Sequence, residues 1–252
     1  MAESWILNGF FDSTKLTGLY EAVRRRESCR LFASAPCTEK WNALLSAADE
    51  LALPGMRIAL GLCDNTLFQP LMGLLMKFEN VQRFAAIIVT DNHPRGMVNA
   101  GVSGEMFLLR AVELGLGGCW VSGTYKRSQV GLKVREGEKI VALMPLGVPK
   151  VEPEEPIRRK RKEITALCPD YNTLNPVFRE IALYVQSAPS AINLQPWRIT
   201  AQGEARLQIS VPRAAQQLDL GIAISHAVLA LGNTPALFSL DDAALSATID
   251  LL

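Results

Sequence analysis

A hydroxyl and two amides stand close together late in the chain, at Ser190, Asn193 and Gln195. Pro189 and Pro196 flank them, and each proline fixes its own φ and disfavours helical backbone in the residue before it. We therefore expect a fixed, non-helical loop. Such a loop can give and accept hydrogen bonds in the plane of a flat heteroaromatic ligand. The alternative is an ordinary helix-to-strand turn, in which Pro, Asn and Ser serve the backbone.

A second candidate group is basic. Arginines occupy positions 24–26 and 30, at the end of a stretch, residues 16–29, whose apolar residues repeat with helical spacing. A guanidinium meets a phosphate with two parallel hydrogen bonds, and Ser28 adds a short donor. The alternative is a solvated helix end, where the helix dipole favours basic residues.

Other chemistries find little support in the residue types. The chain has two histidines, which excludes a His-rich metal site and disfavours a Ser-His-Asp hydrolase, so we expect no metal. His226 lies in the apolar run 221–231, which favours a core or interface histidine over a catalytic base. The five cysteines are widely spaced and form no Cys-x-x-Cys pair, so we expect them to be reduced and structural.

The composition is that of a globular protein. Of 252 residues, 49% are hydrophobic and 20% are charged, and the net charge of +1 gives no argument for binding nucleic acid. Apolar runs are interrupted before they reach membrane-spanning length, and the first residues lack the order of a signal peptide. We therefore expect a cytoplasmic protein with no membrane partner.

The periodicity of apolar residues predicts the helices and strands that must position these groups. Thr38 is expected to be the N-cap of the second helix. Residues 150–162 are rich in proline and charge, which predicts a linker. Helices are expected over residues 16–29, 38–53, 67–78, 101–114 and 176–185, strands over 57–62, 85–90 and 198–200, and a loop over 91–96. Residues 104–115 align with 221–232, and 41–57 correspond to 178–198, which indicates a diverged internal repeat.

The loop resembles the Pro-Ser-x-x-Asn-x-Gln-Pro-Trp signature of the FMN-dependent nitroreductase family, which it matches over residues 189–197. Residues 26–32 are similar to the family's early Arg-Arg-Ser-x-Arg-x-Phe motif, with Glu27 in place of the second basic residue. Residues 101–123 resemble the central helix and the strand that follows it, and residues 144–149 resemble the late strand that ends in Leu-Gly-x-Pro.

The resemblance implies an FMN site that needs no catalytic side chain. Arg26 and Arg30 would bind the phosphate and the flavin, and Arg159 or Arg161 would return to the phosphate. The remaining implied ligands are Glu27, Ser28, Trp120, Val121, Ser122, Gly123, Pro189, Ser190, Ala191, Asn193 and Gln195. The chemistry would be hydride transfer from NADH or NADPH, through the flavin, to a small acceptor of nitroaromatic or quinone type. The alternatives are a flavin-binding sensor or carrier without turnover, and a flavin-free structural or regulatory protein.

The order of the motifs differs from that of an ordinary member, which carries the Gln-Pro-Trp loop before the central helix. This arrangement resembles the single-chain branch of the family, in which fused halves imitate the homodimer. It implies an α+β fold with two similar halves, each a small sheet flanked by helices, related by an intrachain pseudo-twofold. The halves would be residues 1–150 and 171–252, joined by a linker at 151–170. We expect a monomer that acts as a pseudo-dimer and binds one FMN.

Overall fold

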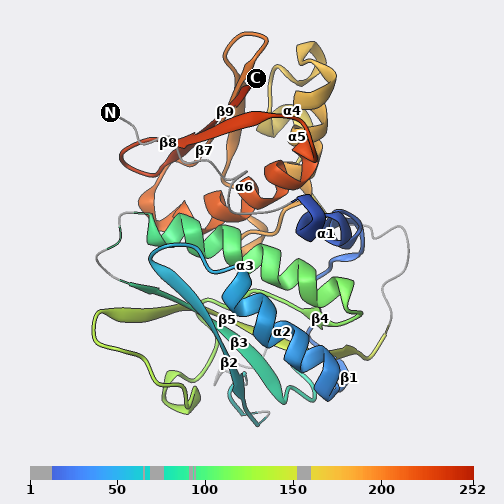
Figure 1. Cartoon of the computed structure of the whole chain (residues 1–252), viewed down its shortest axis with the longest axis vertical. Helices are drawn as coiled ribbons and strands as arrows, with labels where there is room; N and C mark the ends of the chain where they lie inside the picture. Colours follow the sequence, from blue (N-terminus) through green and yellow to red (C-terminus); the bar gives the residue numbers. More distant parts are fainter. Residues whose placement is uncertain (1–12, 65, 69–76, 91–92, 94, 152–159) are drawn as a thin grey trace. The chain divides into compact units, whose positions relative to one another are not determined.

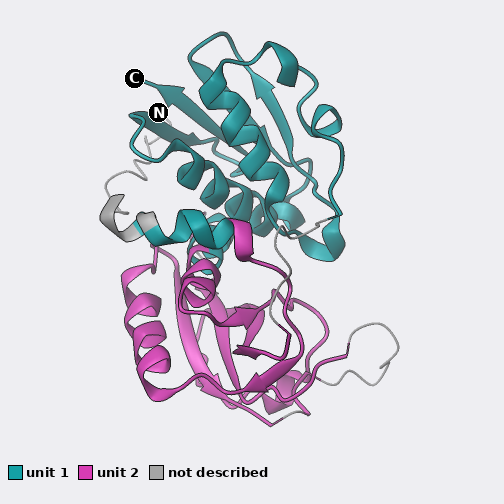
Figure 2. Cartoon of the chain, turned by 90° about the vertical axis from the view of Figure 1, so that its right-hand side faces the viewer, with its two compact units in different colours: residues 1–23, 97–105, 159–252 teal, residues 24–96, 106–158 magenta. Residues whose placement is uncertain are grey.

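The chain forms α-helices and β-strands, and the strands form two separate antiparallel sheets (Figure 1). The computed structural model describes residues 13–64, 66–68, 77–90, 93, 95–151 and 160–252. The chain divides into two compact units (Figure 2). Unit 1 comprises residues 1–23, 97–105 and 159–252, and unit 2 comprises residues 24–96 and 106–158. The expected α+β class is confirmed, and the two units interleave along the chain.

The sheet of unit 2 is built around a strand that is apolar on both faces. In β3 (Arg83–Thr90) all residues from 84 to 89 are buried, and β2 and β5 pair with it on its two edges. The strand order is β1-β5-β3-β2, and β4 also pairs with β5. The other strands are β1 (Phe32–Ser34), β2 (Met56–Leu62), β4 (Gly117–Gly118) and β5 (Glu138–Pro149).

The sheet of unit 1 has the order β6-β7-β9-β8. Its strands alternate, so that Leu207 and Ile209 of β7 are buried while their neighbours are partly or fully exposed. The helix α6 (Gln217–Leu231) packs against this sheet and against α5 (Pro176–Ser187). The strands are β6 (Arg198–Ala201), β7 (Arg206–Ser210), β8 (Ala236–Leu240) and β9 (Ser246–Leu251).

The two sheets share one topology. Each is formed along the chain in the order helix, strand, strand, helix, strand, strand, and in each the strands lie in the order first, second, fourth, third. The series α2 (Thr38–Glu50), β2, β3, α3 (Gly96–Glu113), β4 and β5 thus matches α5, β6, β7, α6, β8 and β9. β1 is an addition at the β5 edge of unit 2. The helices α3 and α6 meet at Gly101 and Gly221, where the sequence alignment had matched Gly104 to Gly221.

Most predicted elements are present, with changed boundaries. The helix α1 (Ser13–Arg25) stops before residue 29, because Cys29 N donates to Gly118 O at 3.1 Å. The N-cap prediction for Thr38 is wrong, since Cys37 occupies that position and makes no side-chain cap bond. The same helix ends at Glu50, not at residue 53. The loop residues 91, 92 and 94, and residues 69–76 of the predicted helix over 67–78, lie outside the described residues.

The start of α5 follows the usual rules for a helix N-terminus. The Asn175 side chain accepts a hydrogen bond from Phe178 N at 2.8 Å, and Pro176 occupies the first turn, where its missing N–H costs nothing. The helix ends at Ser187, two residues before Pro189. Residues 214–231, which include α6, are long and apolar enough to cross a membrane by length and composition, and 67% of this stretch is buried.

Candidate functional site

Sheet pairing brings two of the predicted ligand groups together in unit 2. The segment that carries the arginine motif lies beside β4, with a parallel bridge between Ser28 and Gly118. The chain after β4 is held in turn by an antiparallel bridge between Val121 and Leu143 of β5. The arginine motif is therefore paired with β4, and the chain that follows β4 is paired with β5, although residues 26–30 and 117–123 are far apart in sequence.

The arginines of this group differ in environment. Arg26 is only 2% exposed, whereas Glu27 and Ser28 are exposed and Arg30 is partly buried. Arg30 Nη1 lies 3.4 Å from Ser28 O, and Arg30 Nε is buried and makes no hydrogen bond with the described residues. A buried guanidinium N–H without an acceptor is costly. Arg30 thus keeps a donor that a bound ligand can satisfy.

The strand end beside the arginines presents open backbone. Val121 is buried and points into the core of unit 2, while Ser122 and Gly123 are exposed. A Cβ added to Gly123 would meet no atom within 4 Å among the described residues, so the space on that side of the residue is open. The N–H groups of a glycine-containing turn are suited to donate to a ligand that approaches closely.

The thiols in this region are unsuited to nucleophilic chemistry. Burial raises the pKa of Cys119 to about 12, although the charges of Arg30 and Arg26 act in the opposite direction. Burial also raises the pKa of Cys29. Both thiols therefore stay protonated near neutral pH. All five cysteines are free, as the spacing predicted.

The predicted non-helical loop of unit 1 is confirmed. After the buried Ala188 and Pro189 the chain makes a 3-10 turn, Ala191–Asn193, in which φ is +43° at Ile192 and +58° at Asn193. Gln195 also has a positive φ, of +45°. These values are costly for non-glycine residues and persist only where surrounding contacts enforce them.

The amides of the loop bond mainly to its neighbour in the fold, the segment 160–162. Gln195 Oε1 accepts from Lys162 N at 2.9 Å, and Lys162 Nζ donates to Gln195 O at 3.2 Å. Asn193 Oδ1 accepts from Arg161 Nη1 at 2.9 Å, and Asn193 Nδ2 donates to Lys160 O at 3.0 Å. These amides thus bond to the chain itself. Arg159, the other predicted phosphate ligand, lies outside the described residues.

Two further contacts fix the base of the loop. Ser190 Oγ accepts from Gln195 N at 2.8 Å, and Asp219 Oδ1 accepts from Ala191 N at 3.0 Å. Asp219 is 6% exposed, and burial raises its pKa while the Ala191 N–H lowers it. The sequence reasoning missed Asp219 and Lys162. The signal for Asp219 was an acidic residue in the first turn of α6, where the helix dipole favours negative charge.

Comparison with known proteins identifies a family and similar solved structures. A family model described as "Putative TM nitroreductase" matches residues 18–231. A Thermotoga maritima MSB8 protein described as a "putative nitroreductase" has a TM-score of 0.67 at 22% identity, over 92% of this chain and 93% of that chain. This likeness shows the fold. No curated protein matches the sequence.

Two shorter structural matches are weaker. Nitroreductase A of Vibrio parahaemolyticus RIMD 2210633 has a TM-score of 0.47 at 19% identity, over 60% of this chain and 74% of that chain. An FMN-dependent nitroreductase of Clostridium difficile R20291 has a TM-score of 0.41 at 19% identity, over 61% of this chain and 96% of that chain.

Proposed function

The chain belongs to the TM nitroreductase family, and from that premise we propose that it is an FMN-dependent oxidoreductase. It takes a hydride from NADH or NADPH and delivers it to a small acceptor of nitroaromatic or quinone type. The bound FMN supplies the hydride chemistry, and the protein supplies binding, orientation and charge.

The observation that carries the proposal is the pairing of the arginine segment with β4. The bridge between Ser28 and Gly118 supports a site that combines Arg26, Ser28 and Arg30 with the chain after β4, where Ser122 and Gly123 are exposed. Guanidinium and hydroxyl donors suit a phosphate, and backbone N–H groups suit the polar edge of a flavin ring. The unsatisfied Nε of Arg30 fits the same ligand, because it needs an acceptor.

Each residue has a defined task in this proposal. Arg26 and Ser28 bind the phosphate, and Arg30 offers a fixed cation to negative charge on the flavin ring. Ser122 and Gly123 donate backbone hydrogen bonds to the ring. The resemblance to the family also implies Asn193 as a ligand of the ring edge and Pro189 and Ser190 as its cover. The resemblance further implies Trp120, Val121, Ala191, Gln195, Arg161 and Arg159 as ligands. Glu27 replaces a basic residue of the family motif, which weakens phosphate binding.

We also propose that the chain acts as a cytoplasmic monomer that imitates a family homodimer. The shared topology of the two sheets supports an internal repeat. The arginine motif occurs only in the first half of the sequence and the Gln-Pro-Trp loop only in the second. One chain thus has the ligands for one FMN.

The experiment that tests the proposed function begins with the purified protein. It is incubated with FMN, freed of unbound flavin and denatured, and the released cofactor is identified by chromatography. We expect FMN and not FAD, because the chain lacks a Gly-x-Gly-x-x-Gly turn between a strand and a helix. Anaerobic NADH or NADPH should then bleach the bound flavin, and a nitroaromatic or quinone should restore its absorbance.

Three other results would contradict this proposal. Bound FMN that neither nicotinamide reduces would indicate a sensor or carrier. No binding of FMN at micromolar concentrations would indicate a flavin-free protein of the same fold. FAD as the tightly held group would refute the choice of cofactor.

A further inference from the structure

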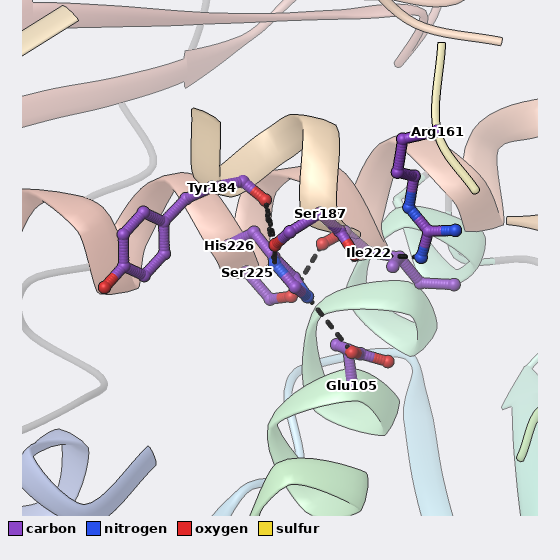
Figure 3. Close-up of polar contacts among 7 residues, drawn as sticks. All are labelled: Glu105, Arg161, Tyr184, Ser187, Ile222, Ser225 and His226. Carbon is purple, nitrogen blue, oxygen red and sulfur yellow. Dashed lines mark hydrogen bonds and ion pairs between the residues drawn. The ribbon is translucent and has the colours of Figure 1, made fainter. Parts of the chain in front are cut away.

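A polar pair is buried in the core of unit 1. Glu105 of α3 and His226 of α6 are both 0% exposed, and His226 Nε2 lies 3.1 Å from Glu105 Oε1 (Figure 3). The other ring nitrogen, Nδ1, lies 3.0 Å from Tyr184 O and 3.1 Å from Ser187 Oγ. His226 thus joins α3 to the end of α5.

The partners of the ring define its orientation. A backbone carbonyl such as Tyr184 O can only accept, so Nδ1 of His226 carries a hydrogen. A second hydrogen lies between His226 Nε2 and Glu105 Oε1, bound either to the imidazole or to the carboxyl group. Glu105 therefore prevents the ring from turning over, as a carboxylate commonly does for a functional histidine.

The apolar surroundings make burial of this pair unfavourable in free energy. Along α6 the neighbours Ala223, Ile224 and Ala227 are fully buried. Burying a carboxyl and an imidazole costs free energy unless each is hydrogen-bonded, and apolar residues of similar volume are often as stable or more stable. A core built for stability alone has no need of such a pair, which points to a positional role.

The hydrogen bonds lead from the pair to the surface. Ser187 is the last residue of α5, and its carbonyl accepts from Arg161 Nη2 at 3.0 Å. The other guanidinium nitrogen, Arg161 Nη1, donates to Asn193 Oδ1 at 2.9 Å. Figure 3 shows Ser187 between the imidazole of His226 and the guanidinium of Arg161. The path therefore runs from the buried Glu105 to the exposed Asn193.

A nucleophilic role for Ser187 does not suit this geometry. Its Oγ donates to Tyr184 O at 2.7 Å, three residues earlier in the same helix, so its hydrogen is already engaged. Ser225 makes the same kind of bond in α6, to Ile222 O at 2.7 Å. The two serines differ in their contact with His226.

We propose that Glu105 and His226 are positioning residues that hold the loop of residues 187–195 in its ligand-binding conformation. His226 fixes the end of α5 through Ser187, Ser187 fixes Arg161, and Arg161 orients the side chain of Asn193. The inference rests on the proposed function for its ligand, because FMN is the group that the loop would contact. The order of the loop itself is measurable without FMN.

The test compares two pairs of variants by amide hydrogen exchange in the flavin-free protein. In His226→Gln the amide replaces Nε2, so it keeps the contact with Glu105 and loses the contacts of Nδ1. In His226→Asn the amide replaces Nδ1, so it keeps the contacts with Tyr184 and Ser187. Ser187→Ala and Ser225→Ala form the second pair, because both remove a hydroxyl bonded to a helix carbonyl.

The reporting amides are those of Asn193 and Gln195, which donate to Ser190 O at 3.0 Å and Ser190 Oγ at 2.8 Å. Loss of one hydrogen bond that holds the loop should speed their exchange about three- to tenfold. We expect this in His226→Gln and Ser187→Ala, with a smaller change in His226→Asn and none in Ser225→Ala. The dissociation constant for FMN should rise by a similar factor in the same two variants.

Two results would overturn the inference. One is equal loop exchange in Ser187→Ala and Ser225→Ala, and the other is equal acceleration in the two His226 variants, which would reflect general destabilisation. If the His226 variants do not fold, the comparison of loop exchange in Ser187→Ala and Ser225→Ala tests the inference by itself. Loop exchange that changes as expected in a protein that binds no FMN would uphold the positioning role and refute the proposed function. Bound FMN with unaltered loop exchange would uphold the proposed function and refute the positioning role.

Discussion

A Cβ added to Gly101 of α3 would lie 2.2 Å from Leu218 O, and one added to Gly221 of α6 would lie 2.0 Å from Val98 O. The two contacts are reciprocal, because each glycine meets the carbonyl three positions before the other. Real Cβ atoms do not approach backbone oxygen so closely. The helices cross at this point only because both residues lack a side chain.

Gly221→Ala should therefore destabilise the protein. Alanine gains about 1 kcal/mol over glycine within a helix, but the added methyl group meets backbone that cannot rotate away. We expect a net loss of about 1–3 kcal/mol in the free energy of unfolding, measured by urea titration. Gly123→Ala is the control, since its Cβ would meet no atom within 4 Å. Equal stability of the two variants would show that α3 and α6 do not pack closely at Gly101 and Gly221.

Arg30→Ala should weaken FMN binding. The substitution removes a partly buried cation whose Nε has no acceptor among the described residues. Loss of one charge-assisted contact corresponds to about 1.5–3 kcal/mol, measured as the dissociation constant for FMN by fluorescence quenching. Arg25→Ala is the matched control, because it removes the same charge five residues away. Arg26 is a poorer choice, because a side chain that is 2% exposed also supports the fold.

The number of flavins per chain tests the fused-dimer proposal. A second site would need an arginine motif in the second half and a Gln-Pro-Trp loop in the first, and the sequence has neither. We expect one FMN per chain in a monomer, measured by flavin absorbance together with solution mass. Two flavins per chain, or one flavin that is lost when a dimer dissociates on dilution, would contradict the proposal.

Acid should weaken unit 2 through one ion pair. Arg57 Nε and Nη2 bind the two oxygens of Glu138 at 2.8 and 2.6 Å and hold the pKa of that carboxyl down, at about 2, against an ordinary 4.5. Since the folded pKa lies below the unfolded one, this stabilisation is complete above pH 4.5. It is lost as the pH falls from about 4.5 to about 2.

Glu138→Gln should remove that part of the pH dependence. The pair is partly solvated, so we expect a contribution of about 1 kcal/mol at neutral pH. The measurement is the free energy of unfolding in urea at neutral and acidic pH for both proteins. If the wild type and Glu138→Gln lose the same stability on acidification, the ion pair does not contribute.

Local chemistry in the sequence was enough to determine the loop as a non-helical segment. Pro189 and Pro196 restrict the backbone wherever the chain is placed, and the helix before them ends at Ser187. Apolar periodicity likewise determined most helices and strands, because burial of one face or of a whole strand leaves a pattern in neighbouring residues.

Only the tertiary structure decided which groups meet. Nothing near residue 29 in the sequence shows that α1 must stop at Arg25, because the cause is the pairing of Cys29 with Gly118. The loop amides were expected to face a ligand, and several of their hydrogen-bond partners lie in residues 160–162. The Glu105–His226 pair joins two helices that are far apart along the chain. Hydrogen-bond partners over such separations depend on how the elements pack, and periodicity and propensity carry no information about them.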